Sequence, residues 1–404
     1  MTTFGFKTID EFQVSGKTAL VRVDFNSPLS PDGSSLADTA IIREHAKTIK
    51  DLSQRGAKVV VMAHQGRAGD EDFTSLQIHA HALSKEIGKA VLFVDDVFGI
   101  GARQAISALK PGDVLVLENV RFYSEETIEK EPEQQAKTIM VRKLSPLLDL
   151  YVGDAFSVAH RKHVSMLGFP KVLPHCVGRV MQEELEALSR ALESPAHPSV
   201  YLLGGSKPDD SFKVANRVLR DGLADQVLCA GLLGQAVLKA QGLSLGEKNE
   251  ALLAKKGADK AVLDGIASLQ REFPGKLLGP IDVAIRRNGK REEIAISSLP
   301  VEEDLMDIGS QTISSFAAVI ARAKTIVVNG PAGVYEDPDF MVGTKQLFEA
   351  VADSGGYSIM GGGHTISAID ELGMWGRFSH ISTAGKALID FMAGEKLPGI
   401  EVLR

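Results

Sequence analysis

The segment RVMQEELEALSRALESPAHPSVYLLGGSK, residues 179–207, divides this chain into two unlike halves. In its first part, apolar residues recur at the spacing of one helix face with polar residues between them, which predicts an amphipathic helix. The apolar positions are Met181, Leu185, Leu188 and Leu192. We expect this helix to connect two domains, because the predicted strands before it end in Arg, His and Asn, whereas those after it end in Gly, Asn and Thr.

The end of the same segment predicts a phosphate site. Pro195 and Pro198 end the helix, and the short apolar run 199–203 is typical of a buried strand. This strand opens into GGSK at 204–207. Glycines let an anion approach the backbone, and the lysine adds a positive charge.

Length and composition indicate a globular protein with two domains. At 404 residues the chain exceeds the size at which one hydrophobic core usually keeps growing. Hydrophobic residues make up 44% and charged residues 24%, near the ordinary values, so composition suggests neither a disordered nor a fibrous protein. The formal net charge of −7 argues against a general nucleic-acid-binding protein, which needs a cationic surface.

No segment indicates a membrane or secreted protein. No apolar run reaches the roughly 20 residues that span a bilayer, and residues 1–7 lack a secretory pattern. Cys176 and Cys229 lie far apart without metal-ligand neighbours, so we expect buried free thiols. These features predict a cytoplasmic protein that binds neither membranes nor nucleic acids.

The first half alternates predicted strands and helices, which indicates a parallel, doubly wound sheet. In such sheets ligands bind beyond the carboxyl ends of the strands. Basic residues follow these ends: Arg22, His64, Arg67, Arg121, His160 and Arg161. Unrelated solvated residues would show mixed charges and as many lysines as arginines. Guanidinium groups hold carboxylates and phosphates through paired hydrogen bonds, so the first half predicts a site for a small anion.

The second half repeats the alternation but ends its strands in glycine. Predicted strands lead into Gly231, into NGPAG at 329–333 and into GGGHT at 361–365. Glycine permits close approach of a nucleotide, and the N-terminus of a following helix donates N–H groups to phosphates. We interpret residues 243–300 as a peripheral scaffold with a hairpin at Asn288-Gly289.

Two common nucleotide motifs are disfavoured. SGKT at 15–18 matches the end of a P-loop, but Glu11 occupies the first glycine position and a strand follows, so we predict a turn. No predicted strand is followed by G-x-G-x-x-G, which argues against a dinucleotide-dependent dehydrogenase.

Together these segments resemble the phosphoglycerate kinase family along essentially the whole chain. The resemblance rests on RVDFN at 22–26, HQGR at 64–67, ENVR at 118–121, GDAF at 153–156 with AHR at 159–161, GGSK at 204–207, NGPAG at 329–333 with Glu336, GGGHT at 361–365 and HIST at 380–383. It implies an α/β fold of two Rossmann-like domains with parallel sheets joined by an interdomain helix. The implied divisions are 1–178 for a phosphoglycerate-binding domain, 179–193 for the helix, 194–387 for a nucleotide-binding domain, and 388–404 for a segment that returns to the N-terminal domain.

The resemblance also implies site residues. The expected contacts to phosphoglycerate come from Arg22, Asp24, Phe25, Asn26, Arg43, His64, Gln65, Gly66, Arg67, Arg121, His160 and Arg161. The expected nucleotide contacts come from Gly205, Lys207, Asn329, Glu336, Gly362, Gly363, His364 and Thr365.

The implied reaction is reversible phosphoryl transfer between ATP and the carboxylate of 3-phosphoglycerate, which gives ADP and 1,3-bisphosphoglycerate in glycolysis and gluconeogenesis. Such transfer depends on alignment and charge neutralisation, which we assign to Arg43 and Lys207 as catalytic residues. Mg²⁺ is expected to enter with the nucleotide, without a dedicated metal site on the protein. Because donor and acceptor belong to different domains, hinge motion is expected.

Three positions depart from the family pattern. Ser211 stands where many members have a second lysine, with Lys213 following; Val328 replaces a tryptophan, and His364 replaces an aspartate. These departures are similar to the pattern of archaeal members. Two alternatives stay open: a carboxylate kinase of the same architecture with a different acid, and a non-catalytic metabolite-binding protein. The sequence is compatible with a monomer or a homodimer.

Overall fold

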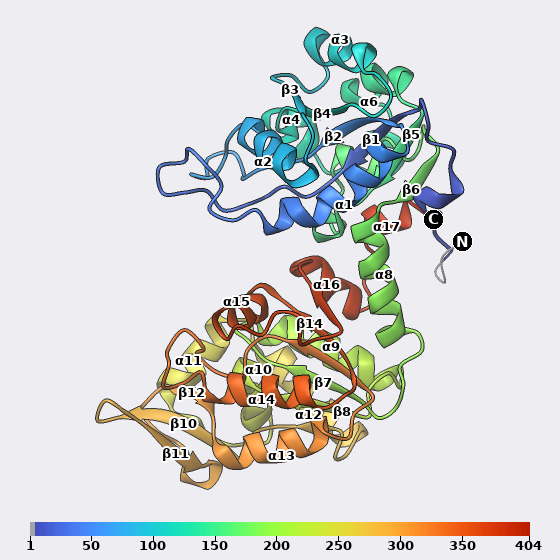
Figure 1. Ribbon diagram of the computed structural model, residues 1–404. Coiled ribbons are helices and arrows are strands. Elements are labelled where there is room, and N and C mark those ends of the chain that lie inside the picture. The colour runs from blue at the N-terminus through green and yellow to red at the C-terminus, as the bar shows by residue number, and fades with distance from the viewer. Residues whose placement is uncertain (1–4) are drawn as a thin grey trace. The chain divides into compact units, whose positions relative to one another are not determined.

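The chain forms two compact α/β units (Figure 1). The computed structural model describes residues 5–404. The first unit extends to Glu186 and also contains Lys396–Arg404, and the second contains Ala187–Glu395. The boundary between the two units, at Glu186 and Ala187, therefore falls inside helix α8 (Arg179–Leu192), where the sequence predicts a connecting helix.

The returning segment is shorter than the predicted 388–404. Helix α16 (Lys386–Met392) packs against α9 (Pro208–Arg220), so the residues up to Glu395 belong to the second unit. The chain then ends in α17 (Pro398–Glu401), which packs against α7 (Val164–Leu167) of the first unit.

The first unit is built on a parallel six-stranded sheet of order β3-β4-β2-β1-β5-β6. Its strands are β1 (Thr18–Arg22), β2 (Lys58–Met62), β3 (Leu92–Val94), β4 (Val114–Leu117), β5 (Leu150–Gly153) and β6 (His175–Val177). Its other helices are α1 (Ala40–Gln54), α2 (Gln77–Ile87), α3 (Ile100–Ala108), α4 (Ser124–Thr127), α5 (Pro132–Gln135) and α6 (Ile139–Leu144).

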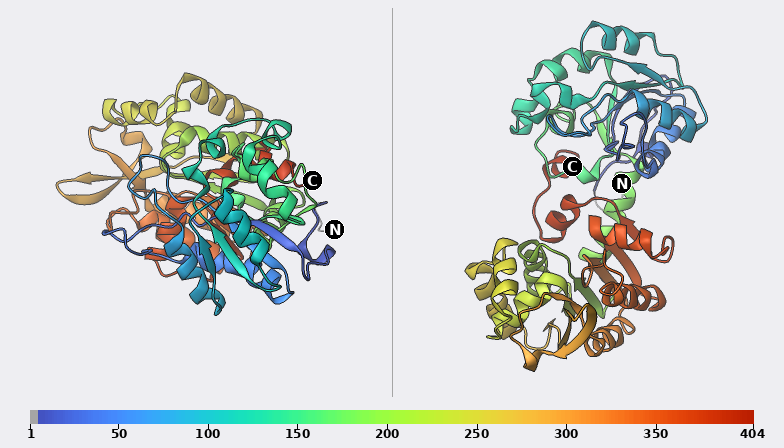
Figure 2. Two further views of the ribbon diagram at one scale, coloured as in Figure 1. Left: turned by 90° about the horizontal axis from the view of Figure 1, so that it is seen from above. Right: turned by 90° about the vertical axis from the view of Figure 1, so that its left-hand side faces the viewer.

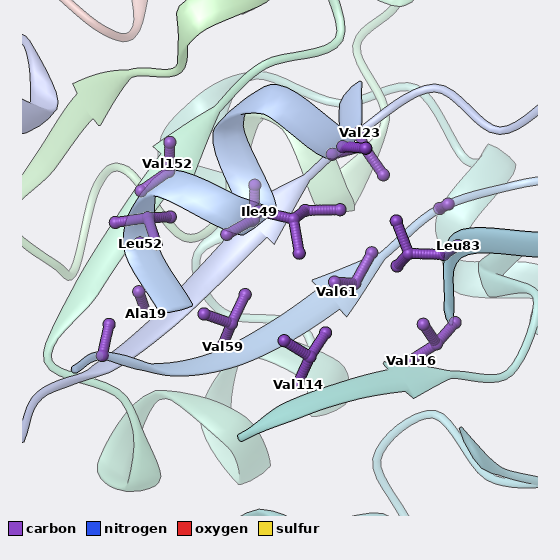
Figure 3. Close-up of a cluster of buried hydrophobic side chains, with 14 of the residues drawn as sticks. Ala19, Val23, Ile49, Leu52, Val59, Val61, Leu83, Val114, Val116 and Val152 are labelled. Carbon is purple, nitrogen blue, oxygen red and sulfur yellow. The ribbon is translucent and has the colours of Figure 1, made fainter. Parts of the chain in front are cut away.

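Valine-rich strands and the apolar face of α1 form the core of this unit (Figure 3). Ile49 and Leu52 project from α1 onto valines of the central strands, and all are inaccessible to solvent. Burying each such side chain contributes about 1.5–3 kcal/mol, and β-branched valines suit a sheet covered on both faces. The predicted ligand edge of the sheet is therefore held by a rigid core.

The second unit contains a parallel sheet and a smaller antiparallel one, of orders β15-β14-β13-β7-β8-β9 and β11-β10-β12. The strands are β7 (Ser199–Leu203), β8 (Gln226–Cys229), β9 (Leu277–Leu278), β10 (Asp282–Arg287), β11 (Lys290–Ala295), β12 (Leu305–Ile308), β13 (Thr325–Asn329), β14 (Tyr357–Gly361) and β15 (His380–Ser382). The remaining helices are α10 (Gly231–Ala240), α11 (Glu247–Lys255), α12 (Lys260–Glu272), α13 (Ser310–Ile320), α14 (Val342–Asp353) and α15 (Gly363–Glu371).

Two local predictions are confirmed, the hairpin turn and the free buried cysteines. Asn288 and Gly289 both have positive φ, 51° and 74°, as a two-residue hairpin turn requires. The resulting hairpin β10–β11 protrudes from the second unit (Figure 2). Cys176 and Cys229 are free and buried. Among residues 5–404, every helix is too short or too polar to cross a bilayer.

Candidate active site

The first unit has a polar pocket at the carboxyl ends of β1, β2, β4 and β5. Its lining consists of Asp24, Asn26, His64, Gly66, Arg67, Asp70, Asp72, Arg121, Ser157, Val158, His160 and Arg161. The parallel order of the sheet brings these residues, which are far apart in the sequence, to one edge. Eight of the predicted anion-site residues are thus gathered in one place.

Hydrogen bonds between loops fix the pocket's shape. The Gly66 N–H donates to Asn26 Oδ1 at 2.8 Å, and the Asn26 N–H donates to Asp24 Oδ1 at 2.9 Å. The Ser157 hydroxyl donates to Asp24 Oδ2. Gly66 has a φ of 63°, and a Cβ there would lie 2.6 Å from the Phe73 nitrogen, so this close turn requires glycine. The loops after β1, β2 and β5 are therefore tied together before any ligand binds.

His64 is held neutral in this pocket. Its Nδ1 lies 3.3 Å from the Arg22 guanidinium, and because arginine can only donate, Nδ1 must accept and Nε2 must carry the proton. Burial lowers the pKa of His64 well below its ordinary value, and the nearby Arg22 and Arg121 charges lower it further, against the opposing effect of Asp24. The imidazole can therefore donate a hydrogen bond from Nε2 near pH 7.

Arg67, Arg121 and Arg161 line the pocket together. Burial, followed by repulsion from Arg22 and Arg161, lowers the pKa of Arg121 to about 10. Burial and then Arg67 lower the pKa of Arg161. The Arg161 Nε is buried and has no hydrogen-bond partner, and within residues 5–404 none of the three side chains forms a salt bridge. Arg121 donates from Nη1 to the Gly66 carbonyl, so its charge has a backbone acceptor but no carboxylate partner. A bound anion would stabilise these neighbouring positive charges.

Four residues expected at this site do not line the pocket. The Arg22 side chain is 1% exposed and donates from Nε to Ser165 at 2.8 Å, and Phe25 stacks on His79 in the core. Gln65 is buried and accepts from the Ser27 N–H at 2.9 Å. These three side chains support the pocket wall. Arg43 lies on α1, where it is 64% exposed and 3.5 Å from Glu86.

Sequence analysis missed four lining residues, Asp70, Asp72, Ser157 and Val158. Ser157 and Val158 directly follow the predicted strand-end motif at 153–156, so extending that motif would have found them. Asp70 and Asp72 lie in a loop without any periodic pattern.

The second unit has a mainly apolar pocket at the carboxyl ends of β7, β8 and β13. It is lined by Gly205, Ser206, Gly231, Leu232, Gln235, Leu252, Lys256, Pro280, Val283, Leu305, Met306, Asp307, Ile308, Pro331, Ala332, Gly333, Val334, Tyr335, Glu336 and His364. Aliphatic walls beside a glycine-rich edge suit a flat aromatic base joined to a charged group.

Glycines allow three strand-end loops to cross beside this pocket. The Gly205 N–H donates to the Pro331 carbonyl at 2.8 Å, and the Gly231 N–H donates to the Ala332 carbonyl at 2.9 Å. Gly330 has a φ of 91°, and a Cβ there would lie 2.5 Å from the Gly204 carbonyl carbon. Larger residues would separate these backbones, so the glycines serve close packing as well as ligand access.

The start of α15 lies beside the same loops. Thr365 Oγ1 accepts from the Gly330 N–H at 2.8 Å, and Asn329 is buried with its Oδ1 unpaired. Gly363 begins α15 without a side-chain cap, so its first N–H groups are available to an anion. Of the expected nucleotide residues, Gly205, Glu336 and His364 line the pocket itself.

The other predicted nucleotide residues lie outside the pocket lining: Lys207, Asn329, Gly362, Gly363 and Thr365. Lys207 is exposed immediately before α9. His364 lies at the pocket edge, where its Nδ1 is 3.3 Å from the Tyr335 hydroxyl and 3.7 Å from Glu336 Oε1.

The interpretation of residues 243–300 as a peripheral scaffold is wrong. Leu252, Pro280 and Val283 from this region line the apolar wall of the pocket. Sequence analysis missed this role because a slot for a base requires only aliphatic side chains, which have no motif of their own.

The fold and the two pockets define a two-domain α/β protein with an arginine-rich pocket in one unit and a mainly apolar, glycine-edged pocket in the other, an arrangement that suits a phosphotransferase. The profile of the family described as phosphoglycerate kinase matches residues 9–395. The chain is 45% identical over 401 residues to the phosphoglycerate kinase of Methanothermobacter thermautotrophicus, covering 99% of this chain and 97% of the relative. It is 47% identical over 405 residues to that of Methanosarcina mazei, covering 100% and 96%.

A solved structure agrees with this result. The crystal structure of phosphoglycerate kinase from Pyrococcus horikoshii OT3 superposes with a TM-score of 0.88 at 39% identity, covering 98% of both chains. The chain belongs to the phosphoglycerate kinase family. It is a kinase that transfers a phosphoryl group between ATP and 3-phosphoglycerate in glycolysis.

Proposed function

We propose that the first-unit pocket binds 3-phosphoglycerate. The observation that carries this proposal is the cluster of Arg67, Arg121 and Arg161, in which the buried Arg161 Nε lacks an acceptor. A ligand with both a phosphate and a carboxylate supplies acceptors to several guanidinium groups at once. Asn26 and the Nε2–H of His64 provide neutral polar contacts that orient the ligand.

The second-unit pocket binds ATP or ADP in this proposal. The apolar wall that includes Leu252, Leu305 and Val334 takes the base. The phosphates lie toward the GGSK loop and the start of α15, where backbone N–H groups and Lys207 favour negative charge.

Mg²⁺ accompanies the nucleotide in this proposal. Within residues 5–404, no three His, Cys, Asp or Glu side chains gather into a metal site. Glu336 lines the pocket and offers the oxygen chemistry that Mg²⁺ prefers, which supports binding through phosphates, water and this carboxylate. When bound, the ion neutralises phosphate charge during transfer.

Arg43 and Lys207 stabilise charge on the transferring group. The acceptor carboxylate is already ionised, so the reaction needs alignment and electrostatic stabilisation rather than a general base. Because the two substrates bind to different units, a hinge motion must bring their reacting atoms together. We also propose a cytoplasmic location, supported by the glycolytic family and by two unpaired cysteines.

A coupled assay tests this function. Purified protein with ATP, 3-phosphoglycerate and Mg²⁺ should produce 1,3-bisphosphoglycerate, and chelation of Mg²⁺ should stop turnover. Turnover with another carboxylic acid but not with 3-phosphoglycerate would identify a different carboxylate kinase. Binding of both ligands without turnover would identify a metabolite-binding protein.

A further inference from the structure

The hairpin β10–β11 carries arginines that contact residues 337–340, the segment that follows the pocket residue Glu336 in the sequence. Arg286 pairs with Asp337 and lies 3.6 Å from Asp339 Oδ2. Arg291 donates to the Asp339 carbonyl at 3.1 Å, and both guanidinium groups stack on the Phe340 ring. This segment directly follows Tyr335 and Glu336 of the pocket, so the hairpin contacts the chain that forms part of the nucleotide wall.

Asp307 is the buried carboxylate of that wall. Its Oδ2 accepts from the Gly343 N–H at 2.8 Å, at the start of α14, and its Oδ1 accepts from the Ile308 N–H at 2.9 Å. A Cβ on Gly333 would lie 2.5 Å from Asp307 Oδ1, so the pocket loop packs directly on this carboxylate. The position of Asp307 therefore determines where the loop and the helix start lie.

Arg291 is the charged partner of Asp307. It donates to Asp307 Oδ2 at 2.8 Å and to the Ile308 carbonyl at 2.9 Å, and its side chain is only 15% exposed. Burial raises the pKa of Asp307 to about 6, although the Gly343 N–H and Arg291 both oppose that shift. Without Arg291 the carboxylate would be left buried with backbone donors alone, which is costly for a charge.

We propose that Arg291 is a positioning residue for the nucleotide. From the protruding hairpin it sets the position of Asp307, and through Asp307 the positions of Gly333 in the pocket wall and of the start of α14. The inference rests on the proposed function, that this pocket binds ATP or ADP. Arg291 contacts Asp307, the Ile308 carbonyl and the Asp339 carbonyl from one planar group. A lysine ammonium is a point charge and cannot reproduce all three contacts in that geometry.

Calorimetric titration with ADP tests the proposal in the full-length protein. Arg291→Gln should weaken ADP binding about tenfold, the usual effect of losing a hydrogen bond to a charged group, and Arg291→Lys should recover part of that loss. The control is Arg287→Gln on the same hairpin, because Arg287 pairs with Glu292 and Glu303 instead. The control should change ADP affinity less than twofold. The KM for 3-phosphoglycerate should not change in any variant.

The pH dependence of ADP affinity distinguishes a positioning role of Arg291 from a general loss of structure in the variant. Arg291 is the charged group that faces Asp307 from β11, and Glu293 pairs with Arg291, while β12 and α14 present backbone N–H groups. Lys256, Glu336 and His364 line the same pocket and are unchanged in the variants. ADP affinity of the unmodified protein should fall as pH drops through about 6. Arg291→Gln should move this midpoint to higher pH, because the Asp307 pKa rises when its charged partner is removed.

Equal ADP affinities in Arg291→Gln and Arg287→Gln, or an unchanged pH midpoint, would overturn the positioning role. If Arg291→Gln does not fold, the midpoint of Arg291→Lys compared with Arg287→Lys decides instead. Val334→Trp, at a 40% exposed position of the pocket, tests the underlying function separately. If that substitution leaves ADP affinity unchanged, the second-unit pocket does not bind the nucleotide, and this conclusion holds independently of the results for Arg291.

Discussion

In the first unit the loops after the central strands carry charged side chains into the pocket, whereas in the second unit the equivalent loops carry glycines. The anion pocket gathers Arg67, Arg121 and Arg161, and the nucleotide pocket brings the backbones of Gly204 and Gly330 into contact. One sheet architecture thus carries two kinds of pocket. In the proposed function, side chains bind the small anion, while backbone and aliphatic surface bind the nucleotide, so substitutions in the two units should have different consequences.

The largest expected effect concerns Arg43. Its exposed pair with Glu86 contributes little to stability, so the guanidinium is free to engage the transferring group. Loss of one such transition-state contact costs about 3–4 kcal/mol, so Arg43→Ala should lower kcat about 100- to 1000-fold. Lys47→Ala, on the same helix, is the control in steady-state kinetics. A rise in KM with kcat unchanged would remove Arg43 from catalysis.

The next effect should show that the arginines of the anion pocket favour ligand binding but lower the free energy of unfolding of the unliganded protein. Arg121→Ala should raise the KM for 3-phosphoglycerate about tenfold or more, by loss of a charge-assisted hydrogen bond. The substitution relieves the cost of burying the Arg121 charge and its repulsion from Arg22 and Arg161, and it removes the hydrogen bond to the Gly66 carbonyl. The free energy of unfolding of the unliganded protein should therefore rise by about 0.5–1 kcal/mol. Denaturant titration measures it, with the exposed Arg142→Ala as control. Lower stability together with an unchanged KM would contradict this account.

A smaller effect concerns acid stability of the first unit. The His64 pKa is lower in the folded than in the unfolded protein, so unfolding takes up a proton below about pH 6.5. The free energy of unfolding should therefore fall as pH decreases from 6.5 toward 5. His64→Gln should reduce this slope, and His81→Gln, at an exposed position of α2, should leave it unchanged. The same slope in all three proteins would show that His64 is not held neutral.

The smallest effect is expected at His364, on the edge of the nucleotide pocket. Mg²⁺ prefers oxygen ligands, so a positioning contact to a phosphate or a metal-bound water is favoured over direct ligation. His364→Ala should weaken ADP binding about two- to fivefold and keep Mg²⁺-dependent turnover. Turnover that no longer depends on Mg²⁺ in this variant would show that the side chain is a metal ligand.

The sequence predicts the parallel sheets and the strand-end motifs because both depend on local patterns. Valine runs such as 58–62 and the glycines at 204 and 330 are visible without coordinates. Which charged residue enters the pocket depends on tertiary packing. Arg22 is the last residue of β1 and His64 lies just beyond the end of β2, yet the Arg22 side chain points into the core toward Glu126. The wall formed by Leu252 and Val283 has no signature at all, since the same residues would serve in any core.

The central claim is that each unit binds one substrate by its own chemistry, and crossed calorimetric titrations test it most directly. 3-Phosphoglycerate and ADP are each titrated separately into Arg121→Ala and Val334→Trp. Arg121→Ala should lose affinity for 3-phosphoglycerate and bind ADP as the unmodified protein does, whereas Val334→Trp should show the reverse. If either substitution weakens both ligands by the same factor, the two pockets do not have the separate roles assigned to them.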